Sequence, residues 1–268
     1  LNANGTVDTS FPNDLFNGTP SIRGTFPDGD MLVLGGFTRV AGVPKPHIAK
    51  VSVTGVLDPD FHAYFQFNSD TTANLYCAKV RADGWVIVGG SFTHCNGVSK
   101  PSIARLMPDG SLDPSFTTDG YTYGSFEFIT ELADGRLLVA GNNNGYASNW
   151  ITGLSRVLPD GGNDLSFNPG SGFNNEVTAI ATQPDGKSVV AGRFTRVNGE
   201  WTRGLVRVDQ NGTLDPTFIT GTGLMGYAND LAIRPDGRIL VASAAAYNGP
   251  SLSRVKQIAP DGTLDPSF

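Results

Sequence analysis

The feature that most constrains this chain is an eight-residue phrase that returns along its whole length. Its clearest copies are DGSLDPSF at 109–116, NGTLDPTF at 211–218 and DGTLDPSF at 261–268. Looser copies close at Phe11, Phe61 and Phe167, so the closing phenylalanines are 50 to 55 residues apart. A nearly fixed period of this size predicts an array of similar supersecondary units, whereas a sandwich or a barrel needs no such period.

A second phrase, an Asp-Gly pair followed by a short apolar run, recurs out of phase with the first. The Asp-Gly pairs stand at 28–29, 83–84, 134–135, 185–186 and 236–237. Together the two phrases indicate a single repeat domain over residues 1–268, which we expect to be part of a longer chain. It consists of a half unit at 1–11 and five units at 12–61, 62–116, 117–167, 168–218 and 219–268.

The unit at 168–218 shows how each repeat should fold. Asp-Gly or Asn-Gly between apolar runs is a strong hairpin signal, and this unit has such turns at 185–186 and 211–212. The turns join four short strands. The last strand contains a proline, which cannot donate to a ladder and therefore belongs at a sheet edge. We predict an all-β, propeller-like array of about five four-stranded antiparallel blades, with another stacked or toroidal β-repeat as the alternative.

The two phrases, PDG-K/R-x-x-VAG-x-F and R-V/L-x-x-DG-S/T-LDPSF, resemble the delta-60 repeat family. The resemblance covers residues 1–268. It implies a β-propeller-like fold of the kind found in bacterial secreted and surface proteins and in some phage appendage proteins. It carries no catalytic residue that could be transferred to this chain. The third and fifth units depart from the pattern, after Gly141 and over 243–253.

Composition narrows the function classes. The net charge of −6 makes a nucleic-acid partner unexpected, and the absence of an 18-residue apolar run predicts no membrane span. The aspartates of both phrases stand alone beside Gly or Pro, which favours turn capping over calcium binding. We therefore expect no metal and no cofactor. The two cysteines, Cys77 and Cys95, leave disulfide pairing open.

The sequence offers no recognisable catalytic group. No G-x-S-x-G elbow occurs, and the three histidines lie in separate loops without zinc-site spacing. Carboxylates could still meet in the fold, as in glycoside hydrolysis. Glu127 and Glu131 share one predicted strand, and we interpret them as a solvated strand end. We expect the protein not to be an enzyme.

Strand order predicts which end of the blades could bind a partner. The Asp-Gly turns share one end, and the long, variable connections share the other, which we call the long-loop end. Aromatic residues are frequent in these connections. We interpret Phe65 and Phe67 as core residues. The predicted ligand-binding residues are Tyr121, Tyr123, Trp150, Trp201 and Tyr227.

These observations predict a non-catalytic recognition, adhesion or spacer module of a larger extracellular, cell-surface or virion-appendage protein. Its partners would be a protein or glycan surface at the long-loop end and neighbouring domains of a longer chain. The alternative is a propeller-type hydrolase or lyase acting on polysaccharide. That alternative requires a central cluster of acids, or of Tyr with Arg, drawn from different units.

Overall fold

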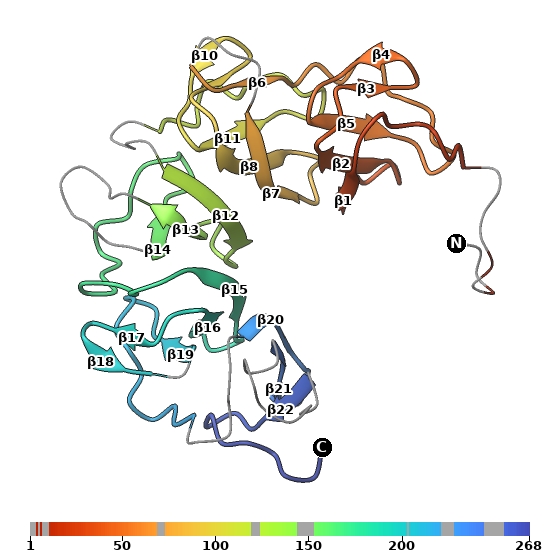
Figure 1. Ribbon diagram of the computed structural model, residues 1–268. Coiled ribbons are helices and arrows are strands. Elements are labelled where there is room, and N and C mark those ends of the chain that lie inside the picture. Colours follow the sequence, from red (N-terminus) through yellow and green to blue (C-terminus); the bar gives the residue numbers. More distant parts are fainter. Residues whose placement is uncertain are drawn as a thin grey trace. The chain divides into compact units, whose positions relative to one another are not determined.

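The computed structural model describes residues 4, 6, 11–68, 73–118, 124–143, 153–202, 204–220, 228–243 and 255–268. The described residues form strands and turns without a helix, which confirms the all-β prediction (Figure 1). Among them, no helix is long and apolar enough to cross a membrane. The chain divides into two compact units, Leu1–Thr118 and Asp119–Phe268.

Each repeat forms one three-stranded antiparallel sheet, which we call a blade, and in each blade the second strand lies in the middle (Figure 1). In the first unit, blade 1 consists of β1 (Pro20–Thr25), β2 (Met31–Gly35) and β5 (Ile48–Val51), and blade 2 of β7 (Asn74–Val80), β8 (Val86–Ser91) and β11 (Ile103–Leu106). In the second unit, blade 3 consists of β12 (Gly124–Glu131), β13 (Leu137–Asn143) and β14 (Gly153–Val157), blade 4 of β15 (Val177–Thr182), β16 (Ser188–Gly192) and β19 (Leu205–Val208), and blade 5 of β20 (Ala228–Ile233), β21 (Ile239–Ser243) and β22 (Val255–Ile258).

The fourth strand of each blade is shorter than the sequence predicts. In blade 4 the closing phrase makes a single β-bridge, between Val208 and Leu214, and the other four blades have the equivalent bridge. The Asp215 N–H still donates to the Arg207 carbonyl at 2.8 Å. The chain then turns, because the next residue is a proline and the Phe218 N–H bonds back to the Asp215 carbonyl. Each blade therefore has three full strands, and the closing phrase adds an edge segment joined by a single β-bridge.

The Asp-Gly turns fold as the sequence predicts. In blade 4, Oδ1 of Asp185 accepts a hydrogen bond from the Lys187 N–H at 3.0 Å, and Gly186 has a φ of +82°. Asp28, Asp83, Asp134 and Asp236 accept the same bond in the other blades. The glycine that ends the apolar run has a different role. A Cβ at Gly141 would lie 2.0 Å from the Ser125 carbonyl oxygen, so only glycine fits there.

Adjacent blades pack through two kinds of apolar face. We call the face bearing Leu32, Leu34 and Ile48 the forward face of blade 1. It packs against the rear face of blade 2, which bears Val86, Val88 and Leu106, and the closing Phe61 is buried in the same cluster. Blades 4 and 5 repeat this joint with Phe218. Each of these closing phenylalanines thus seals its own blade to the next one.

Three blades carry an additional hairpin between their second and third strands. These hairpins are β3 (Arg39–Val40) with β4 (Val43–Pro44), β9 (His94–Cys95) with β10 (Val98–Ser99), and β17 (Arg196–Val197) with β18 (Glu200–Trp201). In blade 2 a further strand, β6 (Phe65–Gln66), extends the hairpin on the β9 side. The corresponding connections of blades 3 and 5 contain 144–152 and 244–254, which lie outside the described residues.

Candidate functional site

The three hairpins at the long-loop end share one backbone conformation. Their turns place two successive residues at positive φ, for example 50° at Asn96 and 78° at Gly97, and 54° at Asn198 and 82° at Gly199. This is the type I′ turn that suits the twist of a two-residue hairpin. The Asn-Gly pairs supply it readily, because both residues tolerate left-handed φ.

A buried aromatic pair fixes the base of each hairpin. The phenylalanine before the hairpin contacts a second phenylalanine from the segment that leads into the same blade. The ring centroids are 4.8 Å apart for Phe16 and Phe37, 4.7 Å for Phe65 and Phe92, and 4.7 Å for Phe173 and Phe194. Phe37, Phe92 and Phe194 are almost completely buried. The hairpins therefore stand on rigid, apolar bases.

A single asparagine braces the hairpin base from the polar side. In blade 4, Oδ1 of Asn174 accepts hydrogen bonds from the N–H groups of Thr195 (2.9 Å) and Arg196 (2.8 Å), and Nδ2 donates to Oγ1 of Thr195 (3.0 Å). In blade 1, Asn17 makes the same three bonds to Thr38 and Arg39. The base of each of these hairpins is thus held by both apolar packing and hydrogen bonds.

The hairpin tips present exposed apolar side chains. Trp201 is 74% exposed, Val98 50% and Val43 46%. The Arg196 guanidinium lies 4.2 Å from the Trp201 ring centroid, a cation–π contact that supports the exposed indole. Sequence reasoning missed the two valines because it selected aromatic residues. Their position directly after the glycine of the type I′ turn is the signal that would have found them.

Only one of the five predicted ligand-binding residues lies in the described part of the chain. Trp201 is exposed, as expected. Tyr121, Tyr123, Trp150 and Tyr227 lie outside the described residues. The structure therefore places only Trp201, which lies beside Arg196 of the same hairpin. The binding role of all five residues stays a prediction.

The two phenylalanines expected in the core have different environments. Phe65 is buried in β6, as predicted. The prediction for Phe67 is wrong, because this side chain is 38% exposed. The strand ends at Gln66, so the alternation that turns Phe65 inward no longer holds Phe67.

A groove of about 400 Å³ adjoins Trp201 on blade 4. It lies between the β17–β18 hairpin and the closing phrase, and its lining combines Trp201 and Ile219 with Glu200, Thr202 and Thr220. Ile219 is 61% exposed. An exposed indole beside an apolar residue and several hydrogen-bonding groups suits a sugar ring or a protein side chain.

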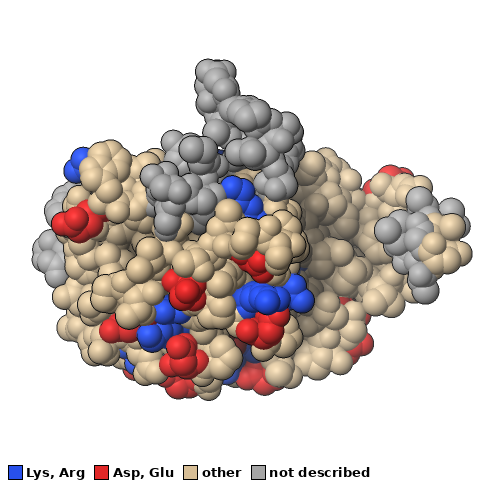
Figure 2. Space-filling view, turned by 90° about the horizontal axis from the view of Figure 1, so that it is seen from below, with Lys and Arg blue, Asp and Glu red and all other residues tan. Residues whose placement is uncertain are grey.

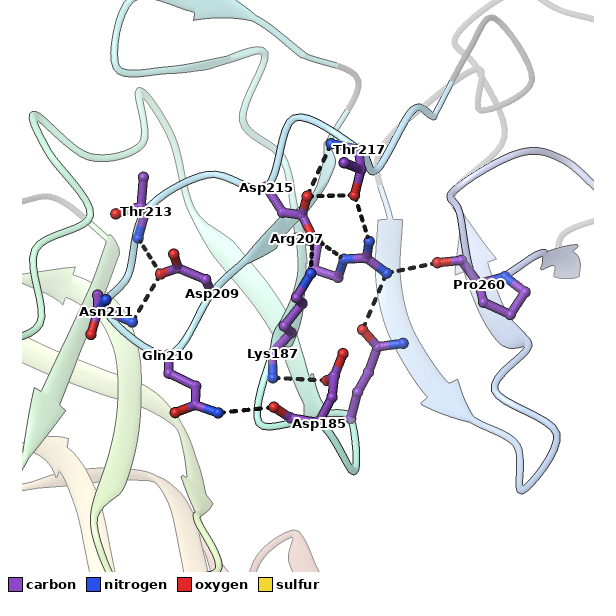
Figure 3. Close-up of polar contacts among 11 residues, drawn as sticks. Asp185, Lys187, Arg207, Asp209, Gln210, Asn211, Thr213, Asp215, Thr217 and Pro260 are labelled. Atoms are coloured by element: carbon purple, nitrogen blue, oxygen red, sulfur yellow. Dashed lines mark hydrogen bonds and ion pairs between the residues drawn. The ribbon is translucent and has the colours of Figure 1, made fainter.

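The recurring aspartates of the closing phrase act within the fold, as Figure 3 shows for blade 4. Oδ1 of Asp215 accepts bonds from the N–H and hydroxyl of Thr217, at 2.9 Å and 2.6 Å, and Oδ2 accepts from Nε of Arg207 at 2.9 Å and Nζ of Lys187 at 2.7 Å. Nη1 of Arg207 also donates to the Pro260 carbonyl of blade 5 at 2.7 Å. The hydrogen bond from Lys187, followed by that from Thr217, holds the pKa of Asp215 far below its ordinary value.

The aspartate of the closing phrase also bonds a third-strand side chain in the other blades. Lys50 pairs with Asp58, Arg105 with Asp113 and Arg156 with Asp164, whereas in blade 5 an amide, Gln257, bonds Asp265. On the face in Figure 2, basic groups accordingly lie beside acidic ones. Within the described residues, no three His, Cys, Asp or Glu side chains form a group that could hold a metal ion.

One carboxylate pair differs from the sequence interpretation. Glu127 and Glu131 do lie on one strand, β12, but Glu127 meets Glu176 of blade 4 beside a pocket of about 450 Å³. Burial, and then the hydrogen bond and charge of Glu176, raise the pKa of Glu127. Nε of Arg193 lies 3.5 Å from Glu176. The sequence could not reveal this pair, because its members come from different repeats, which form blades 3 and 4.

The cysteines are both buried, Cys77 in β7 and Cys95 in β9, and no disulfide joins them. Burial raises the pKa of the Cys95 thiol to about 12. This thiol is therefore protonated and packs as a small apolar group.

The repeat phrases match a known family, described as a domain of unknown function (DUF5122) beta-propeller, at residues 27–61, 81–116, 183–218 and 234–268. These segments make up more than half of the chain. The chain belongs to this family. Each match runs from around an Asp-Gly turn to the closing phenylalanine, so the DUF5122 pattern covers the second and third strands and the closing phrase of a blade and omits its first strand.

Solved structures confirm the propeller fold of this DUF5122 protein. A gluconolactonase from Xanthomonas campestris is 14% identical, with a TM-score of 0.53, over 93% of this chain and 76% of that one. Virginiamycin B lyase from Staphylococcus aureus is 14% identical, with a TM-score of 0.54, over 94% and 70%. PorZ, a bacterial surface component of the type-IX secretion system of Porphyromonas gingivalis, is 11% identical, with a TM-score of 0.55, over 95% and 34%. No curated protein matches the sequence.

Proposed function

We propose that this protein is a non-catalytic recognition or adhesion module of a larger extracellular, cell-surface or virion-appendage protein, of the delta-60 kind. The observation that carries the proposal is the set of three hairpins at the long-loop end. They share one turn conformation and a buried aromatic pair at the base but have different tips: Val43 and Pro44, Val98 and Ser99, Glu200 and Trp201. A constant frame with variable exposed tips is how rigid scaffolds present binding residues.

The opposite end of the blades supports the same assignment. Its turns are specified by hairpin geometry, and its recurring aspartates already bond their own turns or the cations of the third strand. They are thus engaged within the fold.

The groove beside Trp201 has a lining of apolar and hydrogen-bonding side chains. A group from a glycan or from a protein surface would fit such a mixed lining.

The hydrolase or lyase alternative is favoured by one observation, the Glu127–Glu176 pair beside a pocket. Burial, with the hydrogen bond and charge of Glu176, raises the pKa of Glu127, which suits a general acid. Glycosidase pairs stand about 5 Å or more apart, since a nucleophile or a water must act between them. Loss of a polysaccharide-cleaving activity in Glu127→Gln would support the alternative.

The test is a glycan array and a panel of purified cell-surface and virion proteins, probed with the wild-type chain and with Trp201→Ala. We expect Trp201→Ala to weaken binding by about 1–2 kcal/mol or more and to leave the melting temperature nearly unchanged. The matched control is Val53→Ala, which removes an apolar side chain, 64% exposed, from a turn at the other end of blade 1.

Two results would contradict the proposal. One is binding that survives Trp201→Ala, Val43→Asp and Val98→Asp but fails in Val53→Ala. The other is a lower melting temperature in all three tip variants with binding unchanged. The second result would mean that the hairpins only stabilise the blades and that the module is a spacer.

A further inference from the structure

In blades 1 and 2 a lysine ties the hairpin to the closing phrase. The residue that follows the hairpin of blade 1 is Lys45, and its Nζ donates a hydrogen bond to the Phe61 carbonyl at 2.5 Å. In blade 2, Nζ of Lys100 donates to the Phe116 carbonyl, also at 2.5 Å. Lys100 is only 8% exposed, so its side chain runs under cover from the hairpin to the closing phrase. We call this connection the lysine strap.

Blade 4 has a threonine at the position where the strap begins. The N–H of Thr202 donates to the Thr195 carbonyl at 2.9 Å. Lys45 and Lys100 donate in the same way, each to the carbonyl of the threonine seven residues before it. The three residues therefore hold one structural position, and the short side chain of Thr202 cannot form the strap.

The groove of about 400 Å³ beside Trp201 lies along the path of the strap. Its lining includes both ends of that path, Thr202 at the hairpin and Phe218 at the closing phrase. The Thr202 hydroxyl donates to the Leu205 carbonyl at 3.3 Å. Within the described part of the chain, no group donates to the Phe218 carbonyl. The groove therefore keeps the acceptor of the strap without its donor.

Glu200 makes the groove complementary to a cation. This exposed acid lines the groove and stands where the other two hairpins have Val43 and Val98. Among the described residues of the lining, the other charged side chains are Arg207 and Asp215, which pair with each other at 2.9 Å. The charge of Glu200 is therefore the excess charge of the lining, and it favours a positive group of a ligand.

The apolar part of the lining suits an aliphatic stem. Trp201 and Ile219 both line the groove and are 74% and 61% exposed. The Arg196 guanidinium, 4.2 Å from the indole centroid, is not among the described residues of the lining. The groove thus offers apolar contact to a stem, and the carboxylate of Glu200 and the carbonyl of Phe218 to a cationic head.

We propose that the groove of blade 4 binds a lysine side chain of a partner protein, which takes the place of the strap that the chain itself supplies in blades 1 and 2. This inference rests on the proposed recognition function and names its partner. A lysine has a compact ammonium on a flexible four-carbon stem, as the strap requires, whereas the planar guanidinium of arginine matches a carboxylate fork. An amino sugar carries the ammonium without that stem.

The direct test is a titration of the ¹⁵N-labelled chain with Nα-acetyl-lysine N-methylamide. The readout is the NMR resonance of the Trp201 indole N–H, assigned by its loss in Trp201→Ala. We expect a saturable shift with a dissociation constant on the order of a few mM. The norleucine analogue, which has a four-carbon stem but no ammonium, and glucosamine should each bind at least about tenfold more weakly.

Two acid variants test the charge of the groove. Glu200→Gln keeps the size of the side chain and should weaken binding of the lysine compound by about two- to fivefold. Asp14→Asn removes an exposed carboxylate from the segment that leads into blade 1, so it is the matched control and should bind like the wild type.

Thr202→Lys gives the decisive result, because it restores the strap within the chain. The new ammonium should bond the Phe218 carbonyl and raise the melting temperature by about 2–4 °C. The new side chain should also occupy the groove and weaken binding of the lysine compound at least about tenfold. Tight binding by Thr202→Lys, an unshifted Trp201 resonance in the wild type, or equal binding of the norleucine analogue would overturn the proposal.

The same variant separates this inference from the recognition function. A protein partner from the panel that requires Trp201 but binds Thr202→Lys as tightly as the wild type would refute lysine insertion and leave the recognition function standing. Panel binding that survives all three tip variants would overturn both.

Discussion

The Arg156–Asp164 pair of blade 3 allows the energy of the closing phrase to be measured. Nε of Arg156 lies 2.7 Å from Oδ2 of Asp164, and the two side chains are only 3% and 8% exposed. Oδ1 of Asp164 accepts bonds from the N–H and hydroxyl of Ser166. Asp164→Asn keeps the size of the side chain and removes its charge.

The expected loss follows from the structure. Burial opposes ionisation of Asp164, but the bonds from Ser166 and Arg156 outweigh it and lower the pKa from 3.8 to about 2. A shift of nearly two units corresponds to about 2.5 kcal/mol. Removing one member of a buried ion pair typically costs 3–5 kcal/mol. We therefore expect Asp164→Asn to lower the free energy of unfolding by about 3 kcal/mol at pH 7.

Urea-induced unfolding at a series of pH values measures this loss. Because the carboxyl pKa is lower in the folded state, its stabilisation is complete above the unfolded pKa and disappears as the pH falls through the folded one. The difference between wild type and Asp164→Asn should therefore shrink between about pH 4 and pH 2.

The last repeat, which forms blade 5, provides a matched control. Asp265 holds the same place in its phrase, but its Oδ2 accepts from the uncharged Nε2 of Gln257 at 2.7 Å, and its cation, Arg238, is exposed and lies 3.9 Å away. Asp265→Asn should destabilise the protein less than Asp164→Asn. A loss below about 1 kcal/mol for Asp164→Asn, or one that stays constant to pH 2, would refute the ion-pair argument.

Two further predictions concern packing and the acid pair. Phe116→Ala should reduce the free energy of unfolding by roughly 3–5 kcal/mol in a urea titration, because this ring is 1% exposed. The control, Phe268→Ala, changes a ring that is 62% exposed and should cost under about 1 kcal/mol. Equal losses would contradict the sealing role of the closing ring. Glu127→Gln should raise the melting temperature at pH 7 and leave it equal to that of the wild type at low pH. Because the carboxyl pKa of Glu127 is raised in the folded state, the wild type loses stability as the pH rises through this pKa. A variant that melts below the wild type at pH 7 would show that the Glu127 charge stabilises the fold.

The repeat period and the turn residues determined the fold class. Asp185-Gly186 predicts its hairpin because the side-chain bond to Lys187 and the positive φ are properties of a few adjacent residues. The closing phrase likewise predicted its own turn and a buried phenylalanine. Its arginine partner escaped prediction because Arg156 and Asp164 lie on opposite sides of a turn, and their contact depends on how the edge of the blade folds back.

The candidate site was predictable only in part, for the same physical reason. Local sequence located the long-loop end and the exposed Trp201, since hairpin tips follow from turn chemistry. The exposed valines Val43 and Val98, directly after the turn glycine, were identifiable from the turn but were missed. Local sequence could not anticipate that Phe67 leaves the core where β6 ends, or that Glu127 meets Glu176. Local bonds are specified by neighbours in the chain, whereas burial and contacts between blades depend on residues about 50 positions apart, and only the tertiary structure brings these together.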